Sequence, residues 1–309
     1  MEQRAFGPSG LKLSLVGLGT NNFGGRIDLE ASRKVIHKAL DLGVTHFDTA
    51  DVYGNSGGSE EILGKVLGPR RSEVVLATKF GAQMAGSSEA HRGRRDYVIA
   101  AVEASLRRLQ TDRIDLLFMH RPDASTPIEE TLRALDDLHD AGKVGVIAAS
   151  NFTAAQLEDA DATAKRIGVP GFAGTQDEYS LTARGVETAL VPTLTKLGLG
   201  LIPYFPLGGG ALSGKYRKGS PHPPGVRHKD GSDRFLEPHW DTIESLAAFA
   251  EARGRTLLEL AMSWLAMRPL VVSIIAGATK PEQVEANAKS VNWRLSADEM
   301  AEVDRITAV

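Results

Sequence analysis

A regular alternation of strand-like and helix-like segments runs through nearly the whole chain and limits the folds it can adopt. Eight short apolar or β-branched segments end in polar residues, and segments with the 3.6-residue period of amphipathic helices lie between them. The predicted strands are Val16–Gly19, Val44–Asp48, Val74–Lys79, Ile114–His120, Val144–Ser150, Phe172–Gln176, Leu199–Tyr204 and Val271–Ala276. Capping boxes at Thr153–Gln156, Thr256–Glu259 and Ser296–Glu299 predict three of the helix starts. Eight alternating units predict an α/β fold of the closed (β/α)8 class, the TIM barrel.

Two further features complete the predicted fold. The segments Gln3–Phe6 and Leu11–Leu15 flank the turn sequence GPSG at 7–10 and predict an N-terminal β-hairpin. The interval between the seventh and eighth strands is the longest, and its Gly- and Pro-rich stretch 206–238 predicts a long loop after the seventh strand. No linker-like composition occurs elsewhere, so residues 1–309 are predicted to form a single (β/α)8 barrel domain.

Composition and charge argue against several classes of function. The net charge is −3 with both signs interspersed, so nothing favours binding to nucleic acid or to an anionic membrane surface. The chain has no cysteine, which rules out disulfides and thiolate metal sites and fits a reducing cytoplasm. The N-terminal sequence MEQRAFGPSG has no apolar h-region, and no apolar run approaches the length of a membrane span. We therefore expect a cytoplasmic protein without a signal peptide.

Reactive side chains stand at the ends of three consecutive predicted strands. Asp48 ends the second strand, Tyr53 follows it in FDTADVYG, Lys79 ends the third in ATKFG, and His120 ends the fourth in MHRPD. In a (β/α)8 barrel the carboxyl ends of all strands meet at one face, where active sites form. The four side chains are therefore predicted to face one cavity.

These four residue types complement one another chemically, although each alone has an ordinary structural explanation such as a cap, packing or solvation. A tyrosine has a pKa of about 10, and a nearby ammonium lowers that pKa by favouring the phenolate. A carboxylate beside the ammonium holds it in place, and an imidazole can donate a hydrogen bond to a carbonyl. The set predicts that Tyr53 protonates a carbonyl oxygen while hydride from a nicotinamide reaches the carbon. No HExxH or other clustered metal ligands occur, so no metal site is predicted.

The motifs FDTADVYG, ATKFG, MHRPD, ASNF, TQDEYSL, PYFPLGGGALSGKY and GATKPEQVEANA together resemble the aldo-keto reductase family over nearly the whole chain. The resemblance implies a (β/α)8 barrel with a hairpin over its bottom. It implies that Asp48, Tyr53, Lys79 and His120 form the catalytic tetrad, with Tyr53 as the general acid. It further implies NADPH-dependent reduction of an aldehyde or ketone, a small-molecule carbonyl substrate, to the alcohol.

The resemblance also implies where a nicotinamide cofactor binds. Ser150, Asn151 and Gln176 match residues that hold the carboxamide, and Tyr204 matches the aromatic residue that stacks on the nicotinamide ring. The segment GATK followed by Pro281 suits a phosphate at a helix N-terminus. The expected cofactor residues are Gly19, Thr20, Ser150, Asn151, Gln176, Tyr204, Phe205, Pro206, Leu207, Gly209, Lys215, Arg227, Gly277, Thr279, Lys280, Gln283 and Asn287.

Three positions depart from the pattern of some family members. Gly277, Gln283 and Ala286 stand where those members have lysine, arginine and glutamate. The basic residues left for the adenosine 2′-phosphate are Lys280, Lys215 and Arg227. We therefore predict that NADP(H) is preferred and that NAD(H) is possible.

Other interpretations remain open from the sequence. The segment 17–22, GLGTNN, resembles a Rossmann fingerprint without its third glycine, and Asp48 would then bind a ribose. Lys79 at a strand end could form a Schiff base, although Asp48 argues against it. Ion-channel β-subunits also resemble the family, bind NADPH and turn over slowly, but they replace the tetrad histidine with asparagine. His120 therefore favours an enzyme.

The sequence is least informative about the substrate. We expect the walls of the pocket to come from Phe23, Phe80, Arg121 and the 206–238 loop. These residues suggest a partly apolar cleft with one anion contact, at Arg121. Neither the physiological substrate nor the oligomeric state can be read from the sequence.

Overall fold

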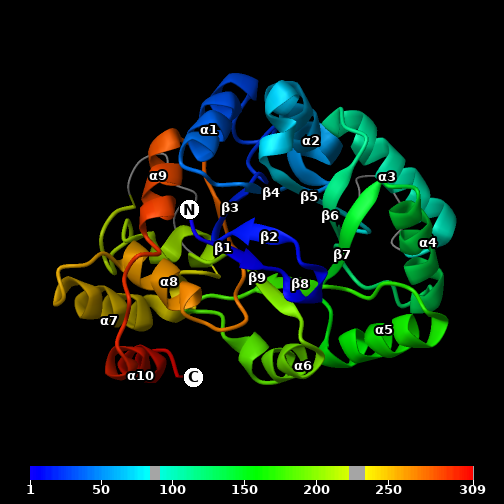
Figure 1. Cartoon of the computed structure of the whole chain (residues 1–309). Helices are drawn as coiled ribbons and strands as arrows, with labels where there is room; N and C mark the ends of the chain where they lie inside the picture. Colours follow the sequence, from blue (N-terminus) through cyan, green and yellow to red (C-terminus); the bar gives the residue numbers. More distant parts are fainter. Residues whose placement is uncertain (84–90, 223–233, 309) are drawn as a thin grey trace.

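The computed structural model describes residues 1–83, 91–222 and 234–308 (Figure 1). It begins with a two-stranded antiparallel sheet in which β1 (Gln3–Ala5) pairs with β2 (Lys12–Ser14). The turn between them places Gly7 at a φ of 51°, where a Cβ would lie 2.0 Å from the carbonyl oxygen of Ala173. Only glycine fits such a left-handed position and close approach. The predicted N-terminal hairpin is confirmed.

Eight parallel strands form the barrel behind this hairpin. They are β3 (Val16–Gly19), β4 (His46–Asp48), β5 (Val75–Phe80), β6 (Ile114–Met119), β7 (Val144–Ser150), β8 (Gly174–Glu178), β9 (Gly200–Tyr204) and β10 (Ile274–Gly277). Each strand from β3 to β8 pairs with the next strand in the chain, and β10 pairs with β3. A bridge between Leu201 and Val271 joins β9 to the segment before β10 and closes the ring. The predicted (β/α)8 barrel is confirmed.

Three strands begin two or three residues later than predicted: β4 at His46, β8 at Gly174 instead of Phe172, and β10 at Ile274 instead of Val271. The second barrel strand was expected from Val44, but β4 starts at His46. The backbone N–H groups of Thr45 and His46 both donate to Ser14 Oγ, at 3.0 Å each. The hairpin therefore takes the hydrogen bonds that would have extended this strand.

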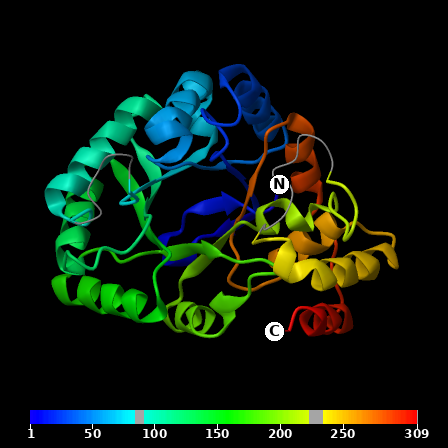
Figure 2. The same cartoon turned by 180° about the vertical axis from the view of Figure 1, so that it is seen from behind.

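Ten helices of the described residues surround the barrel (Figure 2). They are α1 (Leu29–Asp41), α2 (Tyr53–Leu67), α3 (Arg95–Leu109), α4 (Ile128–Asp140), α5 (Ala154–Ile167), α6 (Leu190–Leu197), α7 (Trp240–Glu251), α8 (Leu257–Ala266), α9 (Pro281–Lys289) and α10 (Ala297–Ile306). The three predicted capping boxes are present, at the starts of α5, α8 and α10. In the described part of the chain, no helix is both long and apolar enough to cross a membrane.

The segment after the seventh strand of the barrel, β9, is long, as predicted. It opens with the short 3-10 segment η4 (Gly208–Ser213), in which Ala211 and Leu212 are buried. Residues 223–233 within it lie outside the described part of the chain, and α7 then follows. Figure 1 looks onto the hairpin, and Figure 2 looks onto the opposite end, where η4 lies.

The core has two parts because side chains alternate between the two faces of each strand. A large cluster fills the space between barrel and helices, and includes Phe47, Leu76 and Phe80. A smaller cluster combines strand residues such as Leu116 with residues of the N-terminal segment, including Phe6 and Leu13. The hairpin end of the barrel is therefore filled, and the open end is the one at which the strands finish.

Candidate active site

A buried ion pair lies where β4 and β5 end. The ammonium of Lys79, which is fully buried, donates to both carboxylate oxygens of Asp48 at 2.8 and 2.7 Å. It also donates to the carbonyl oxygen of Thr49 at 2.7 Å. Burial alone lowers the pKa of Lys79, but the charge of Asp48 and contact with Tyr53 raise it above its usual value. Lys79 is therefore charged across the physiological pH range.

Tyr53 is the first residue of α2 and lies against this ion pair. The Lys79 ammonium is 5.0 Å from the centroid of the Tyr53 ring. The pKa of Tyr53 is raised, because burial outweighs the lowering effect of the Lys79 charge. The expected lowering of the tyrosine pKa is therefore wrong for this structure, although the predicted effect of the ammonium is present. Tyr53 is protonated at neutral pH and has a proton to give.

His120 follows β6 and faces Tyr53. Their ring centroids are 6.0 Å apart and their planes are nearly perpendicular. The backbone fixes His120 because its N–H donates to the carbonyl of Phe80 at 2.8 Å. Burial, with smaller effects of the Lys79 and Arg121 charges, lowers the pKa of His120 to about 3. A neutral imidazole carries one N–H and can donate it to a carbonyl oxygen.

A chain of side-chain hydrogen bonds continues along the ends of the next three strands. Ser150 Oγ donates to the backbone carbonyl of Gln176 at 2.8 Å, and Asn151 Nδ2 donates to Ser150 Oγ at 2.9 Å. Tyr204 OH donates to Asn151 Oδ1 at 2.7 Å. Gln176 Nε2 donates to Asp48 Oδ1 at 2.9 Å. The four polar side chains expected at the nicotinamide are therefore linked to one another and to the ion pair.

A cavity of about 860 Å³ opens above these residues. Asp48, Tyr53 and His120 line it, whereas Lys79 lies behind them. The cavity also brings together all but one of the predicted cofactor residues: Gly19, Thr20, Ser150, Asn151, Gln176, Tyr204, Phe205, Pro206, Leu207, Gly209, Lys215, Gly277, Thr279, Lys280, Gln283 and Asn287. The remaining one, Arg227, lies outside the described residues.

One end of the cavity is suited to phosphate groups. Lys280 is the N-cap residue of α9, with Pro281 at the first helical position. The free N–H groups of a helix N-terminus attract anions. Gln283 Oε1 accepts from the backbone N–H of Thr279 at 2.7 Å, which fixes the turn before the helix. Gly209 in η4 has a φ of 63°, and a Cβ there would lie 2.7 Å from the Phe235 ring. The residues present therefore fit the phosphates of a dinucleotide.

The cavity also contains residues that were not predicted from the sequence. Those with polar or charged side chains include Asn21, Asn22, Arg26, Glu178 and Arg234. Asn21 and Glu178 follow or end barrel strands, which is a signal that was available in the sequence. Arg26 and Arg234 carry no such signal, because they come from the loops after β3 and β9.

Two predicted wall residues are placed elsewhere. Phe23 and Phe80 belong to the core between the strands and the helices and are at most 1% exposed. Phe80 follows Lys79 on β5, and alternation along a strand sends it to the opposite face. Of the named wall residues that the structure describes, Arg121 lines the cavity, as do several residues of the 206–238 segment.

The structure argues against the two alternative interpretations, a Rossmann fingerprint at 17–22 and a Schiff base at Lys79. Gly17 and Gly19 lie on β3 inside the barrel, where a Cβ at Gly17 would lie 2.9 Å from His46 Nδ1. These glycines allow close strand packing, and the Rossmann interpretation is wrong. Lys79 is charged and bound to Asp48, whereas a Schiff base needs a neutral amine.

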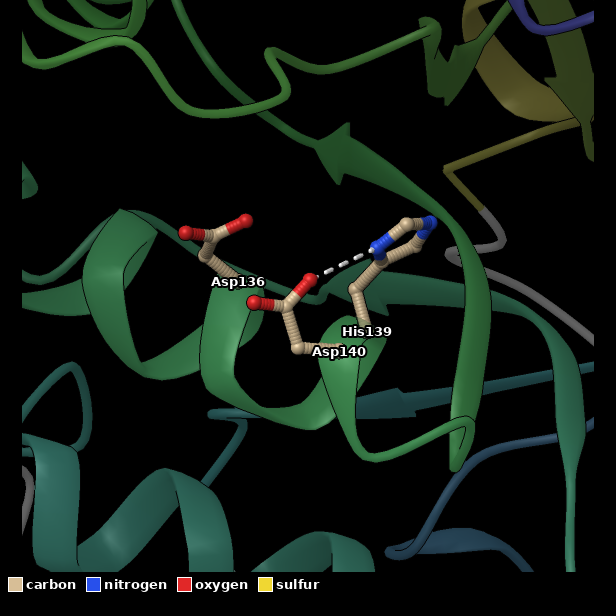
Figure 3. Close-up of side chains that lie close together, drawn as sticks. All are labelled: Asp136, His139 and Asp140. Atoms are coloured by element: carbon tan, nitrogen blue, oxygen red, sulfur yellow. Dashed lines mark ion pairs between the residues drawn. The ribbon is translucent and has the colours of Figure 1, made fainter.

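One group in the described residues has the side chains of a metal site, namely Asp136, His139 and Asp140 on α4 (Figure 3). It lies at the hairpin end of the barrel, next to a smaller cavity of about 300 Å³ that Pro8 and Ser9 also line. His139 and Asp140 are exposed, and their shortest N–O distance is 3.7 Å. Exposed acidic groups on one helix are common without an ion, so we assign no metal here.

The comparisons with known proteins agree with this geometry. The family model described as "Aldo/keto reductase family" matches residues 15–308. The chain therefore belongs to the aldo-keto reductase family and is an oxidoreductase of that kind.

Several named relatives match the chain along most of its length. A "Probable voltage-gated potassium channel subunit beta" of Arabidopsis thaliana is 37% identical over 303 residues, which cover 94% of this chain and 92% of that protein. An "L-glyceraldehyde 3-phosphate reductase" of Escherichia coli (strain K12) is 33% identical over 319 residues, with 99% and 92% coverage. An "Uncharacterized oxidoreductase YrpG" of Bacillus subtilis (strain 168) is 34% identical over 308 residues, with 96% and 93% coverage.

Proposed function

We propose that this protein uses NADPH to reduce an aldehyde or ketone to the corresponding alcohol, with Tyr53 as the proton donor. The observation that carries this proposal is the buried Asp48–Lys79 pair directly behind a protonated Tyr53, at the floor of a large cavity. The presence of reductases among relatives that match nearly the whole chain supports it. In this proposal residues 1–309 act as one barrel domain.

The residues divide the chemical work among themselves. A substrate carbonyl oxygen would accept hydrogen bonds from Tyr53 OH and from the neutral His120, which orients the carbonyl above the floor. Bound NADPH supplies the hydride that reaches the carbonyl carbon. As negative charge develops on the oxygen, Tyr53 transfers its proton, and the Lys79 ammonium stabilises the phenolate that remains. Asp48 keeps Lys79 charged and in place.

The same arrangement explains why the raised pKa of Tyr53 is compatible with catalysis. A tyrosine that were ionised before the reaction could not donate a proton. Burial keeps Tyr53 protonated, while the charge of Lys79 acts in the opposite sense and favours the phenolate. The ammonium therefore has its largest effect when the proton leaves, which is the property that distinguishes transition-state stabilisation from ground-state binding.

We propose NADP(H) as the preferred cofactor, with NAD(H) as a possible substitute. Ser150, Asn151 and Gln176 would hold the carboxamide, and Tyr204 would stack on the nicotinamide. The preference rests on Lys280 at the start of α9, which is exposed and has no ion-pair partner among the described residues. A 2′-phosphate at that helix N-terminus would meet both a charge and free N–H groups.

A second candidate function is that of a regulatory subunit that binds NADPH and turns over little. The similarity to proteins named as potassium channel β-subunits favours it. His120 argues for the enzyme, because the channel subunits that resemble this family have asparagine at that position. A cysteine-free chain is compatible with a cytoplasmic location in either case, and that location is part of the proposal.

The test is NADPH oxidation, followed by absorbance, against a panel of aldehydes and ketones with and without phosphate groups. We expect turnover by the natural protein and a loss of roughly 10²–10⁴-fold in kcat for Tyr53→Phe. NADPH affinity, measured by fluorescence, should stay nearly unchanged in that variant. Turnover that survives in Tyr53→Phe would refute the assigned proton donor. Tight NADPH binding without turnover on any carbonyl would favour the regulatory subunit.

A further inference from the structure

Arg121 is a charged residue of the cavity that the proposed mechanism does not use. It follows His120 directly, its side chain is exposed, and it lines the cavity. No residue in the described part of the chain forms an ion pair, a hydrogen bond or a ring contact with its guanidinium. A guanidinium has five N–H donors arranged to match a carboxylate or phosphate. Arg121 is therefore available to bind an anion.

The acidic groups that could neutralise Arg121 are engaged elsewhere. Asp123 is close in sequence, but it accepts hydrogen bonds from Gly93 N at 2.8 Å, Ser125 N at 2.9 Å and Thr126 Oγ1 at 2.7 Å. Glu178 lines the same cavity, and its nearest cation is Arg234, at 3.9 Å. The positive charge of Arg121 therefore has no close counter-ion at the mouth of the cavity.

Arg121 lies near the reacting centre. Its charge contributes to the lowered pKa of His120, after burial and Lys79. It also acts on Tyr204, whose pKa burial and the Glu178 and Asp177 charges raise to about 12, while Arg121 lowers it. Arg121 follows His120 in the chain and lines the same cavity as Tyr53, so it belongs to the wall around the position where the carbonyl would be reduced. Lys280, one of the cations expected to bind the 2′-phosphate, stands at the start of another element, α9.

We propose that Arg121 binds an oxyanion carried by the substrate, so that the preferred substrates are small carbonyl compounds bearing a carboxylate or phosphate group. This inference rests on the proposed reductase activity and narrows its substrate class. A charge-assisted contact at one end of the substrate and the hydrogen bonds of Tyr53 and His120 at the other would fix the carbonyl in place. Neutral carbonyls would bind in the same cavity without this contact.

The test compares matched pairs of substrates that differ in charge. One pair is glyceraldehyde 3-phosphate and glyceraldehyde, and the other is succinic semialdehyde and butanal, so phosphate and carboxylate are separated. We expect the natural protein to have a higher kcat/KM for the charged member of at least one pair. Arg121→Gln should lower that kcat/KM about tenfold or more, mainly through KM, and change the neutral member less than about twofold.

Two control variants separate a local contact from a general effect of charge. Arg121→Lys keeps the charge but loses the fork geometry, and should retain part of the preference. Arg133→Gln on the outer surface of α4 removes the same charge far from the cavity and should leave both kcat/KM values unchanged. An equal loss for charged and neutral substrates in Arg121→Gln, or no loss for either, would overturn the proposal.

Failure of the reductase proposal would be recognised separately. If the natural protein reduces none of the four compounds, binding of succinate and glycerol 3-phosphate to the NADPH-loaded protein is measured by calorimetry. Binding that Arg121→Gln weakens about tenfold would support the anion site without the reaction. Binding that the variant does not change, or an absence of binding, would overturn it.

Discussion

Gln176 Nε2 donates a hydrogen bond of 2.9 Å to Asp48 Oδ1, the same oxygen that accepts from Lys79. The two residues belong to β8 and β4, which are not neighbours in the sheet. The amide of Gln176 therefore reaches across the barrel. A residue expected to hold the cofactor also holds the carboxylate behind the proton donor, so cofactor binding and proton transfer share one structural support.

Replacing Gln176 by leucine should therefore affect both steps. Hydrogen bonds to charged groups contribute about 1.5–3 kcal/mol, so we expect kcat to fall roughly 10- to 100-fold. NADPH affinity should fall in the same variant, because the predicted carboxamide contact is lost. Steady-state kinetics and fluorescence titration measure the two effects. Gln156→Leu, which removes the capping box of α5, should cost stability but not kcat. An unchanged kcat in Gln176→Leu would show that Lys79 alone positions Asp48.

The state of His120 predicts the shape of the pH profile. Its pKa of about 3 lies below the unfolded value near 6.5, so the folded imidazole is neutral at every pH above about 4. We expect kcat/KM to show no step from His120 between pH 5 and 8. His120→Asn should lower kcat about 10- to 100-fold, because an amide positions the carbonyl less well, without changing the profile in that range. A step near pH 6.5 that disappears in the variant would contradict the neutral imidazole.

Asp51, in the segment between Asp48 and Tyr53, predicts a pH-dependent stability. Its side chain is buried, and burial, together with the Glu60 charge, raises its pKa to about 7 against the lowering effect of Arg108. The folded state therefore binds a proton more tightly than the unfolded state, whose pKa is near 3.9. Stability is lost as the pH rises between these two values.

Asp51→Asn removes this penalty. We expect the free energy of unfolding of the variant to exceed that of the natural protein by on the order of 1–3 kcal/mol at pH 8, and by less at pH 5. Urea denaturation at the two pH values measures the difference. Asp140→Asn, an exposed carboxyl on α4, should show no such trend. A stability difference that shrinks as the pH rises would mean that the Asp51 carboxylate has a stabilising partner.

Lys280 predicts the cofactor preference. Lys280→Ala should weaken NADPH about 10- to 100-fold and NADH less than about twofold, because NADH has no 2′-phosphate for the ammonium to meet. Lys289→Ala is a matched control at the other end of α9, where the lysine pairs with Glu285 at 2.6 Å. The measurement is the dissociation constant of NADPH and of NADH for the natural protein and both variants. Equal weakening of NADPH and NADH would move the 2′-phosphate away from this helix.

Much of the fold followed from the sequence because the polar ends of the strands mark their limits. Asp48, Lys79, Ser150 and Tyr204 all end barrel strands or lie within one residue of the end. The error of placing Phe80 on the cavity wall could have been avoided, because a lysine that points into the barrel sends the next side chain toward the helices. The late start of β4 could not have been predicted, because it depends on Ser14, which is distant in the sequence.

The pKa shifts in the site were harder to predict than the residues that form it. The sequence identifies Lys79 and Tyr53 as partners but contains no measure of how deeply either is buried. The sign of the Tyr53 pKa shift is decided by that burial, which outweighs the ammonium. Likewise, nothing in the sequence MHRPD shows that Asp123 accepts hydrogen bonds from Gly93 and Thr126. These bonds leave Arg121 without a close counter-ion.

The hairpin at the closed end of the barrel has a consequence for the distant ion pair. Phe6 and Leu13 fill that end together with Phe118, whose ring is 5.9 Å from the Lys79 ammonium. Apolar packing has a low dielectric constant and screens a charge far less than water does. The hairpin thus reduces the screening of the Lys79 charge from the closed end of the barrel. The field of Lys79 therefore stays strong toward the phenol of Tyr53.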